Sequence, residues 1–483
     1  MSDRTQGNGL VCFTNCFLVK EDGTLAPGDL WIDERRGVIL DAQRTFYLRQ
    51  ERPDTVIDLG GNILSPGLID SQINGAYGFD FSIYDKDDRT YSAGLDSVAR
   101  RIVETGVTSF LPTIITQDAH LYPSLLRLLI PRPFLQPAKR GAHALPFLRS
   151  GLDGFSALEE VYGKDALAVQ EDWALASGLG EIDRGVRLVT LAPEVVSPEI
   201  IPDLRKRGVS VAIGHSVASA DTAARAVRAG ARMVTHLFNA MPQLHHRDPG
   251  IIGLLGASDE SLAKVTSNIK DKTSAFGGEV EAIGAECAEA LDESDTPPRT
   301  PTFSPISGDV VMRLDTELNV QEDVIQSEAN KSPGRPYYGM IVDGVHSHPN
   351  SVRLAYTAHM EGCVLITDAM SKLDPTLPDG PHPWRDGRRV VKEGVRLYIE
   401  GTDTLAGSVV TLDTCVRNFK SFTGCSLAES IRCATFNPAK CLGIEMKKGT
   451  LRAGADADLV VFDHKGVVLS TWVRGNKVWE RHL

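Results

Sequence analysis

Two histidines lie in consecutive strand-like runs of this sequence. The first run spans residues 209–216 and contains His215, and the second spans residues 231–240 and contains His236. The stretch 219–229 between them predicts a helix that ends at Gly230. Because parallel strands joined by a helix have their carboxyl ends at one rim, we expect the two imidazoles to lie close together.

A third run, residues 363–368, ends in a carboxylate, Asp368. Two neutral imidazoles and a carboxylate are suited to hold a divalent cation and to deprotonate water. The alternative is that His215 and His236 are structural histidines at strand ends. Their occurrence in successive units, with an acid in a later unit, favours the metal-dependent interpretation.

Length and composition limit the possible classes of protein. The 483 residues suffice for one large barrel and a smaller module, or for two or three ordinary domains. A hydrophobic content of 42% and a charged content of 24% indicate a globular protein, and the net charge of −12 disfavours nucleic acid and anionic membranes as partners. The polar N-terminus, the absence of long apolar runs and eight scattered cysteines predict a cytoplasmic protein with reduced thiols.

The two ends of the chain differ in pattern from its middle. Strand-like segments at 10–13, 28–32, 37–40, 457–463 and 467–475 predict a small β-sandwich built from residues 1–64 and 438–483. Between them, residues 65–437 alternate strand and helix signals, which predicts a (β/α)8 TIM-type barrel. A doubly wound sheet is the alternative, but no Gly-x-Gly-x-x-Gly segment supports it. The fold class is therefore α/β.

Residues 257–336 interrupt the barrel pattern. They carry sixteen acidic and seven basic residues, together with the proline-rich segment 296–305. High charge and few aromatic residues leave little to bury, so we expect a disordered acidic insertion.

Several motifs lie outside the insertion. Two general ones are Pro66-Gly67-Leu68-Ile69-Asp70 and the segment 449–459. Two more specific ones are Thr235-His236-Leu237-Phe238-Asn239-Ala240-Met241 and Asp343-Gly344-Val345-His346. The general pair resembles the signature of the amidohydrolase superfamily, and the specific pair resembles its N-acetylglucosamine-6-phosphate deacetylase family. The resemblance covers nearly all of the remaining chain.

The resemblance implies a role for each of the following residues. His215 and His236 would bind one divalent metal ion, with zinc first and iron, cobalt or manganese as alternatives. Asp368 would move protons between water and the leaving amine, and His143 would polarise the acetyl carbonyl. The implied substrate-binding residues are Ala142, Asn239, Ala240, Arg247, His346, Leu405, Ala406 and Gly407, among which Arg247 suits a phosphate. The resemblance also suggests a homodimer.

One segment fits a site with a single metal ion. Many amidohydrolases place His-x-His after Pro-Gly-x-Ile-Asp, whereas this chain has Gln72-Ile73-Asn74 there, as the deacetylase family usually does. Because amide side chains bind transition metals poorly, we expect no second, buried metal ion.

One departure from the family affects the metal site. The family carries His-x-Glu-Gly-Pro-Phe, whose glutamate is the third metal ligand, and the corresponding residues 129–134 read Leu-Ile-Pro-Arg-Pro-Phe. Pro131 stands at the place of the glutamate, and no strand of ordinary length is recognisable there. The barrel is therefore predicted to lack one strand. Either the gene model is incorrectly spliced and the natural protein is intact, or the chain is real and its catalysis is impaired. We favour the first explanation because every other motif survives.

The resemblance thus implies hydrolysis of the acetamide of N-acetylglucosamine 6-phosphate to glucosamine 6-phosphate and acetate. Two alternatives remain. One is a different amidohydrolase that acts on a cyclic amide, and the other is an impaired or non-catalytic barrel that binds a sugar phosphate.

Overall fold

The computed structural model describes residues 7–116, 118–122, 124–125, 130–131, 154–164, 167, 186–258, 261–262, 334–384 and 387–482. No helix in this part of the chain has both the length and the apolar composition needed to cross a membrane.

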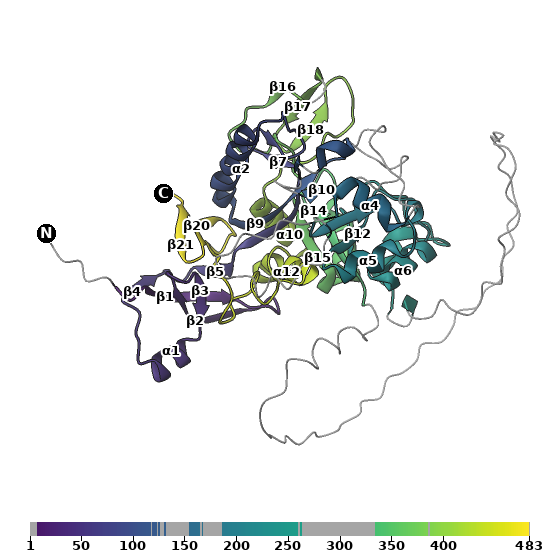
Figure 1. Ribbon diagram of the computed structural model, residues 1–483. Helices are drawn as coiled ribbons and strands as arrows, with labels where there is room; N and C mark the ends of the chain where they lie inside the picture. The colour runs from purple at the N-terminus through teal and green to yellow at the C-terminus, as the bar shows by residue number, and fades with distance from the viewer. Residues whose placement is uncertain are drawn as a thin grey trace, which may run out of the picture. The chain divides into compact units, whose positions relative to one another are not determined.

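Both ends of the chain contribute strands to one sheet (Figure 1). This eight-stranded mixed sheet has the order β21-β20-β19-β5-β1-β2-β3, and β4 pairs with β1. The pairing of β5 with β19 joins the two ends, with Ile63 opposite Phe462. The strands are β1 (Leu10–Val19), β2 (Leu25–Asp33), β3 (Val38–Leu40), β4 (Thr55–Asp58), β5 (Ile63–Pro66), β19 (Leu459–Phe462), β20 (Val468–Val473) and β21 (Asn476–Glu480).

The structure thus has a single sheet where the sequence predicts a sandwich. A bulge between Phe13 and Cys16 divides β1 into two parts. The first part pairs with β4 and the second with β5, so one edge of this long strand forms hydrogen bonds with two different strands. A separate apolar cluster that includes Phe13, Ile32 and Trp472 stabilises this sheet.

The middle of the chain provides eight parallel strands among the described residues, in two sheets of order β10-β9-β6 and β11-β12-β13-β14-β15. They are β6 (Leu68–Ile73), β9 (Val107–Ile114), β10 (Ile130–Pro131), β11 (Leu188–Leu191), β12 (Ser210–Ile213), β13 (Met233–Val234), β14 (Tyr337–Ile341) and β15 (Cys363–Ile366). Two backbone bonds near the carboxyl ends of β6 and β15 join the two sheets, from Asp368 N to Gln72 O and from Asn74 N to Ala369 O, each 2.8 Å. No ladder between β10 and β11 occurs within the described ranges.

The strand β10 corrects one expectation. Ile130 and Pro131 pair in parallel with Thr113 and Ile114 of β9, so a strand of two residues lies where we predicted that a whole strand was missing. A two-residue strand is much shorter than the usual five or six residues. It is too short to show the alternation of apolar and polar residues by which a strand is recognised in a sequence.

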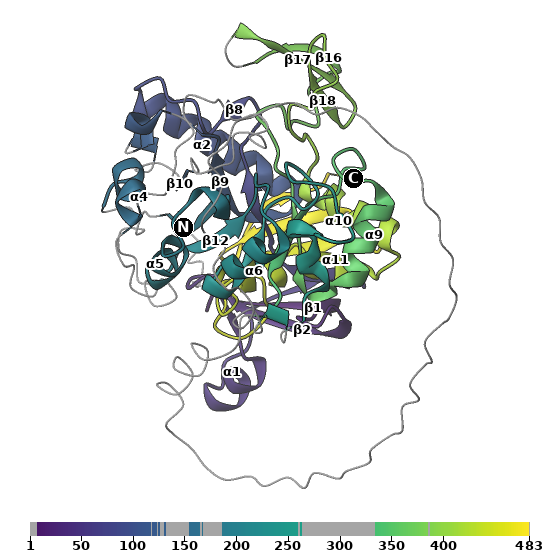
Figure 2. The same ribbon diagram turned by 90° about the vertical axis from the view of Figure 1, so that its right-hand side faces the viewer.

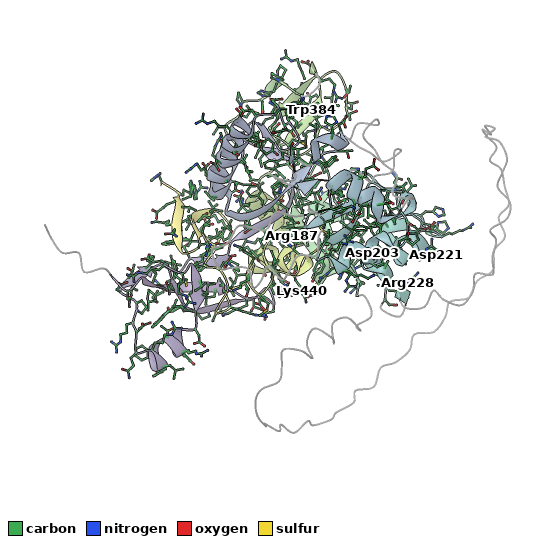
Figure 3. The ribbon with its side chains drawn as sticks, in the orientation of Figure 1. Arg187, Asp203, Asp221, Arg228, Trp384 and Lys440 are labelled. Atoms are coloured by element: carbon green, nitrogen blue, oxygen red, sulfur yellow. The ribbon has the colours of Figure 1, made fainter. Side chains whose placement is uncertain are left out.

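Helices follow the parallel strands and cover their outer side (Figures 1 and 2). Because the strands are covered on both faces, residues such as Val211, Ile213 and Ile366 are completely buried. Figure 3 marks Asp203 on α5 and Asp221 on α6, two of these covering helices. The helices are α2 (Asp88–Ile102), α4 (Phe155–Tyr162), α5 (Ile200–Lys206), α6 (Ala220–Ala229), α9 (Pro349–Ala358), α10 (Leu412–Thr423), α11 (Leu427–Arg432) and α12 (Phe436–Leu442). One further helix, α1 (Ala42–Leu48), lies between β3 and β4 in the chain.

The helix predicted between the two histidines is confirmed as α6. Ser219 caps its first turn by accepting a hydrogen bond from Thr222 N. Gly230 ends it in the left-handed conformation, with φ of 118°. The caps therefore fix the length of the connection between β12 and β13, which positions both histidines.

Three short strands form an antiparallel sheet between β15 and α10. They are β16 (Gly380–Pro383), β17 (Arg389–Glu393) and β18 (Arg396–Ile399). A further hairpin of β7 (Gly75–Ala76) and β8 (Phe79–Asp80) follows β6.

Candidate active site

The two predicted histidines lie together at the carboxyl ends of β12 and β13. Ala212 pairs with Met233 and Ile213 with Val234, so the two strand ends are level. The Nε2 atoms of His215 and His236 are 2.9 Å apart, and both side chains are buried. The expected convergence of the imidazoles is confirmed.

The second strand is shorter than the sequence predicts, and this brings His236 into place. A strand over 231–240 was expected, whereas β13 contains only Met233 and Val234. His236 and His215 adopt φ angles of 27° and 49°, so the chain turns away from the strand direction at each histidine. Such left-handed angles cost a non-glycine residue about 1–3 kcal/mol each and are typical of functional sites.

Close packing beneath the histidines supports this geometry. A side chain at Gly214 would lie 2.7 Å from Cβ of Thr235, so only glycine fits between the strand ends. The buried hydroxyls of Thr190 and Thr235 are 2.9 Å apart and join β11 to the end of β13.

Glu194 holds the residues that follow His215. Its carboxylate accepts hydrogen bonds from Ser216 Oγ and Val217 N, each at 2.7 Å. The sequence motifs did not point to this residue. The available signal was an acid three residues beyond the apolar strand β11, where the loops of a parallel sheet carry functional groups.

Asp368 lies two residues beyond the end of β15, at the carboxyl end of the predicted run, and is held by residues from β6 and the loop after it. Gln72 Nε2 donates to Asp368 Oδ1 at 2.6 Å, and Asn74 Nδ2 donates to the same oxygen at 3.0 Å. Asn74 Nδ2 also lies 3.2 Å from the backbone oxygen of Asp368. The φ angle of Asp368 is 47°, a conformation that these bonds help to maintain.

A second carboxyl, Asp70, lies completely buried behind this contact. It accepts hydrogen bonds from Thr367 Oγ1 at 2.6 Å, Thr367 N at 3.2 Å and Gln72 N at 3.3 Å. Burial raises the pKa of Asp70 to about 7, although the bonds from Thr367 and Gln72 oppose this rise. Asp70 therefore connects β6 to the segment that carries Asp368.

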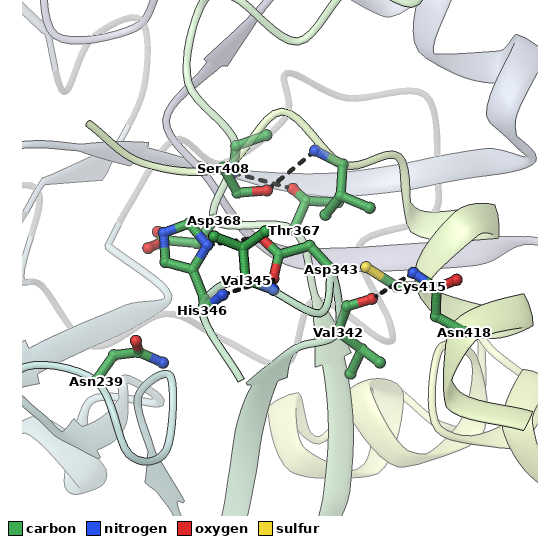
Figure 4. Close-up of polar contacts among 12 residues, drawn as sticks. Asn239, Val342, Asp343, Val345, His346, Thr367, Asp368, Ser408, Cys415 and Asn418 are labelled. Atoms are coloured by element: carbon green, nitrogen blue, oxygen red, sulfur yellow. Dashed lines mark hydrogen bonds and ion pairs between the residues drawn. The ribbon is translucent and has the colours of Figure 1, made fainter. Parts of the chain in front are cut away.

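His346 is bound to Asp343 in the loop after β14 (Figure 4). The ring Nδ1 of His346 and Asp343 Oδ2 are 2.6 Å apart, and Asp343 Oδ1 accepts from Val345 N and His346 N. Burial of Asp343 would raise its pKa, but the hydrogen bond and charge of His346 outweigh this effect, so the pKa lies below the usual value. The carboxylate fixes the imidazole orientation, which leaves Nε2 for a ligand.

The loop after β13 carries the other predicted phosphate residues. Asn239 donates its backbone N–H to His236 O at 2.9 Å, and Ala240 has a φ of 52°. Arg247 is exposed, and the neighbouring Asp248 accepts from Ala220 N at 2.8 Å and Gly250 N at 3.1 Å. These bonds fasten the Arg247 loop to the first turn of α6.

The segment Leu405–Gly407 lies beside the loop of Asp368. Ala406 N donates to Leu397 O at 2.8 Å, and Met370 N donates to Ser408 O at 3.0 Å. Gly407 has a φ of 96°, and an added side chain would meet Met370. The structure therefore brings this predicted substrate segment to the residues just after Asp368.

Two predicted site residues, Ala142 and His143, lie outside the described residues. Within the described part of the chain, no group of three or more His, Cys, Asp or Glu side chains is arranged to hold a metal ion.

Comparisons with known proteins address the family. The amidohydrolase family model matches residues 321–478. The chain is 36% identical to N-acetylglucosamine-6-phosphate deacetylase of Homo sapiens, an alignment that covers 98% of this chain and 97% of the human enzyme. It is 35% identical to the enzyme of the same name from Danio rerio, with 97% of this chain and 96% of the relative covered.

The chain belongs to the N-acetylglucosamine-6-phosphate deacetylase family.

The fold agrees with this membership. The crystal structure of N-acetylglucosamine-6-phosphate deacetylase from Thermotoga maritima matches with a TM-score of 0.66 at 22% identity, over 97% of this chain and all of the other. The Pasteurella multocida enzyme matches with a TM-score of 0.66 at 23% identity, over 97% and 99%. At these identities the likeness concerns the fold alone.

The alignment with the human enzyme contains gaps in this chain. It spans 492 positions, which exceeds the 483 residues of this chain, so some residues of the human enzyme have no counterpart here.

The cation that amidohydrolases use can be compared with the residues present. Nitrogen ligands of a tetrahedral ion lie roughly 3.3 Å apart when each bond is about 2.0 Å. The 2.9 Å between the two Nε2 atoms needs only a small opening to match. His215 and His236 thus suit such an ion, and the set is one protein ligand short within the described ranges.

Proposed function

We propose that this chain hydrolyses the acetamide of N-acetylglucosamine 6-phosphate to glucosamine 6-phosphate and acetate. The observation that carries the proposal is that His215, His236 and Asp368 follow the carboxyl ends of β12, β13 and β15, three parallel strands of one sheet. That end of an α/β barrel is where catalytic residues gather.

Within this proposal, each group has a distinct task. His215 and His236 would hold one divalent cation, with zinc as the first candidate. A cation bound there would polarise the acetyl carbonyl and make the attacking water more acidic. Asp368 takes the proton from that water and returns it to the leaving amine, so the amine departs in a neutral form that gains its charge in solution. His143 is assigned the role of polarising the carbonyl group of the acetyl moiety.

The phosphate end of the substrate needs positive charge and directed donors. Arg247 supplies a guanidinium with paired N–H groups, and His346, oriented by Asp343, supplies an imidazole nitrogen. The backbone near Asn239 and Ala240 would contribute to the same phosphate site. Ala142 and the segment Leu405–Gly407 are assigned to the sugar. An enzyme that acts on a cyclic amide would need no such phosphate site.

The architecture that we propose for this activity is a (β/α)8 barrel over residues 65–437, with the insertion 257–336 as a surface addition and residues 1–64 and 438–483 forming the small β domain. The proposal includes a homodimer in the cytoplasm. Light scattering that gives the mass of a single chain would contradict the dimer.

The main test is Asp368→Asn. We expect turnover to fall by about 100-fold or more while KM changes little, because the amide cannot accept the proton yet keeps the side-chain shape. Release of glucosamine 6-phosphate is measured on the purified chain with added zinc. Asp203→Asn on the exterior helix α5 serves as the matched control and should keep full turnover. A loss below threefold for Asp368→Asn would remove this residue from the mechanism.

One observation favours a second candidate, an impaired enzyme. Only two metal-binding side chains come together within the described residues. Two imidazoles hold a cation less tightly than three protein ligands. We therefore expect the chain as printed to bind zinc weakly, and a variant with a His-x-Glu-Gly-Pro segment restored before Phe134 to bind it tightly. Metal content after gel filtration distinguishes the two, and equal zinc in both would refute the role assigned to that segment.

A further inference from the structure

The amide side chains of Gln72 and Asn74 converge on one carboxylate oxygen. Both donate to Oδ1 of Asp368, at 2.6 and 3.0 Å. Among the described residues, no hydrogen bond reaches Oδ2. The two oxygens of this carboxylate therefore have different surroundings.

The backbone reinforces the same contact. Asp368 N donates to Gln72 O at 2.8 Å, so Gln72 binds residue 368 through both its backbone and its side chain. Asn74 N donates to Ala369 O at 2.8 Å. Gln72 and Asn74 are also buried, with exposed fractions of 2% and 6%, so water does not compete for these bonds.

This arrangement is more than local packing, because it crosses from β6 to β15. Gln72 and Asp368 are separated by 296 residues in the chain. The backbone at Asp368 has a φ of 47°. The bonds from Asp368 N to Gln72 O and from Asn74 Nδ2 to Asp368 O help to maintain this angle. A side chain fixed in this way loses rotational freedom before the substrate arrives.

We propose that Gln72 and Asn74 are positioning residues that bind Oδ1 of Asp368 and so reserve Oδ2 for proton transfer. An ionised carboxylate offers only acceptors, and two amide donors on one oxygen match that state. The inference rests on the proposed function for the proton transfer itself. The contact between the amides and Asp368 is independent of it.

The first arm of the test measures turnover. Gln72→Met removes the donor and keeps the side-chain volume. We expect kcat to fall by about 10-fold or more with KM within about threefold, as for residues that orient a catalytic group. Asn74→Ala should act in the same direction. Asn418→Leu removes a comparable amide, which donates to Val342 O at 2.9 Å, and should lower stability while kcat stays within about twofold of the parent.

The second arm needs no activity. The melting temperature is compared for the parent, Gln72→Met, Asp368→Ala and the double variant. We expect Gln72→Met to lower the melting temperature when Asp368 is present and to have no effect when residue 368 is alanine. An equal effect in both backgrounds overturns the proposal, as does a kcat that stays within about twofold of the parent in Gln72→Met.

Failure of the proposed function has a different signature. It would appear as a parent chain that binds zinc but releases no glucosamine 6-phosphate. In that case the four melting temperatures alone test whether Gln72 binds Asp368. An effect of Gln72→Met that disappears with Asp368→Ala supports the contact, and an effect that persists overturns it.

Discussion

Asp70 allows a quantitative prediction about pH and stability. This carboxyl is completely buried between β6 and Thr367, and its charge in the folded protein has no cationic partner among its three hydrogen bonds. We predict that Asp70→Asn removes a loss of stability that the parent suffers as the pH rises from acid to neutral.

The size and sign follow from the pKa of Asp70, which burial raises from 3.8 to about 7. Because the folded protein holds this proton more tightly, the stabilising contribution is fully present below pH 3.8 and is lost as the pH rises through about 7. A rise of about three pKa units corresponds to roughly 4 kcal/mol of unfolding free energy. Asparagine does not ionise, so the variant should gain up to this amount relative to the parent at pH 8.

The assay is urea unfolding with a chelator present, at several pH values from about 4.5 to about 8. The quantity of interest is the unfolding free energy of Asp70→Asn minus that of the parent, which should rise with pH. Asp374→Asn is the matched control. Burial would raise the pKa of Asp374, but the bonds from Arg101 and Thr376 outweigh this effect and lower it, so its contribution is lost only as the pH falls below 3.8. Its difference from the parent should stay flat. A flat or falling difference for Asp70→Asn would refute the reasoning.

Three further outcomes are expected. Ser219→Ala should lower the unfolding free energy by about 1 kcal/mol in urea titrations, because the cap on Thr222 N is lost. Thr235→Val should cost about 1–3 kcal/mol by leaving the buried Thr190 hydroxyl unpaired, and Thr190→Val in the same chain should recover most of it. Arg247→Ala should raise KM for the phosphate ester by about 10-fold or more and preserve kcat, whereas equal effects on unphosphorylated N-acetylglucosamine would exclude a phosphate contact.

Local signals predicted the elements that carry the site. Ser219 and Gly230 marked both ends of α6, and strand ends marked His215 and Asp368. These predictions succeeded because caps and apolar runs act within a few residues, and because parallel strands share one carboxyl end. The contribution of strands from both chain ends to one β region also followed from matching strand patterns, whereas the single sheet that they form did not.

The contacts between distant segments could not be predicted in this way. Gln72 was interpreted only as a residue that excludes a second metal ion, whereas the structure shows it holding Asp368. Its partner lies far along the sequence and no local pattern connects them. The same reason applies to Glu194. Its carboxylate accepts hydrogen bonds from Ser216 and Val217, which only the fold brings beside it.

The features at the strand ends also bear on the two explanations for the missing ligand. His215, His236 and Asp368 have left-handed backbone angles, and Asp70 is a buried carboxyl, so each lowers the stability of the fold. A barrel that served only as a scaffold would be more stable without them. Their joint presence around one rim is explained if the protein acts through a complete site, which favours an incorrectly spliced gene model. Transcript sequencing across codons 116–134 decides between the two explanations. An additional segment that encodes His-x-Glu would complete the ligand set, and a transcript without it would make the impaired enzyme the real product.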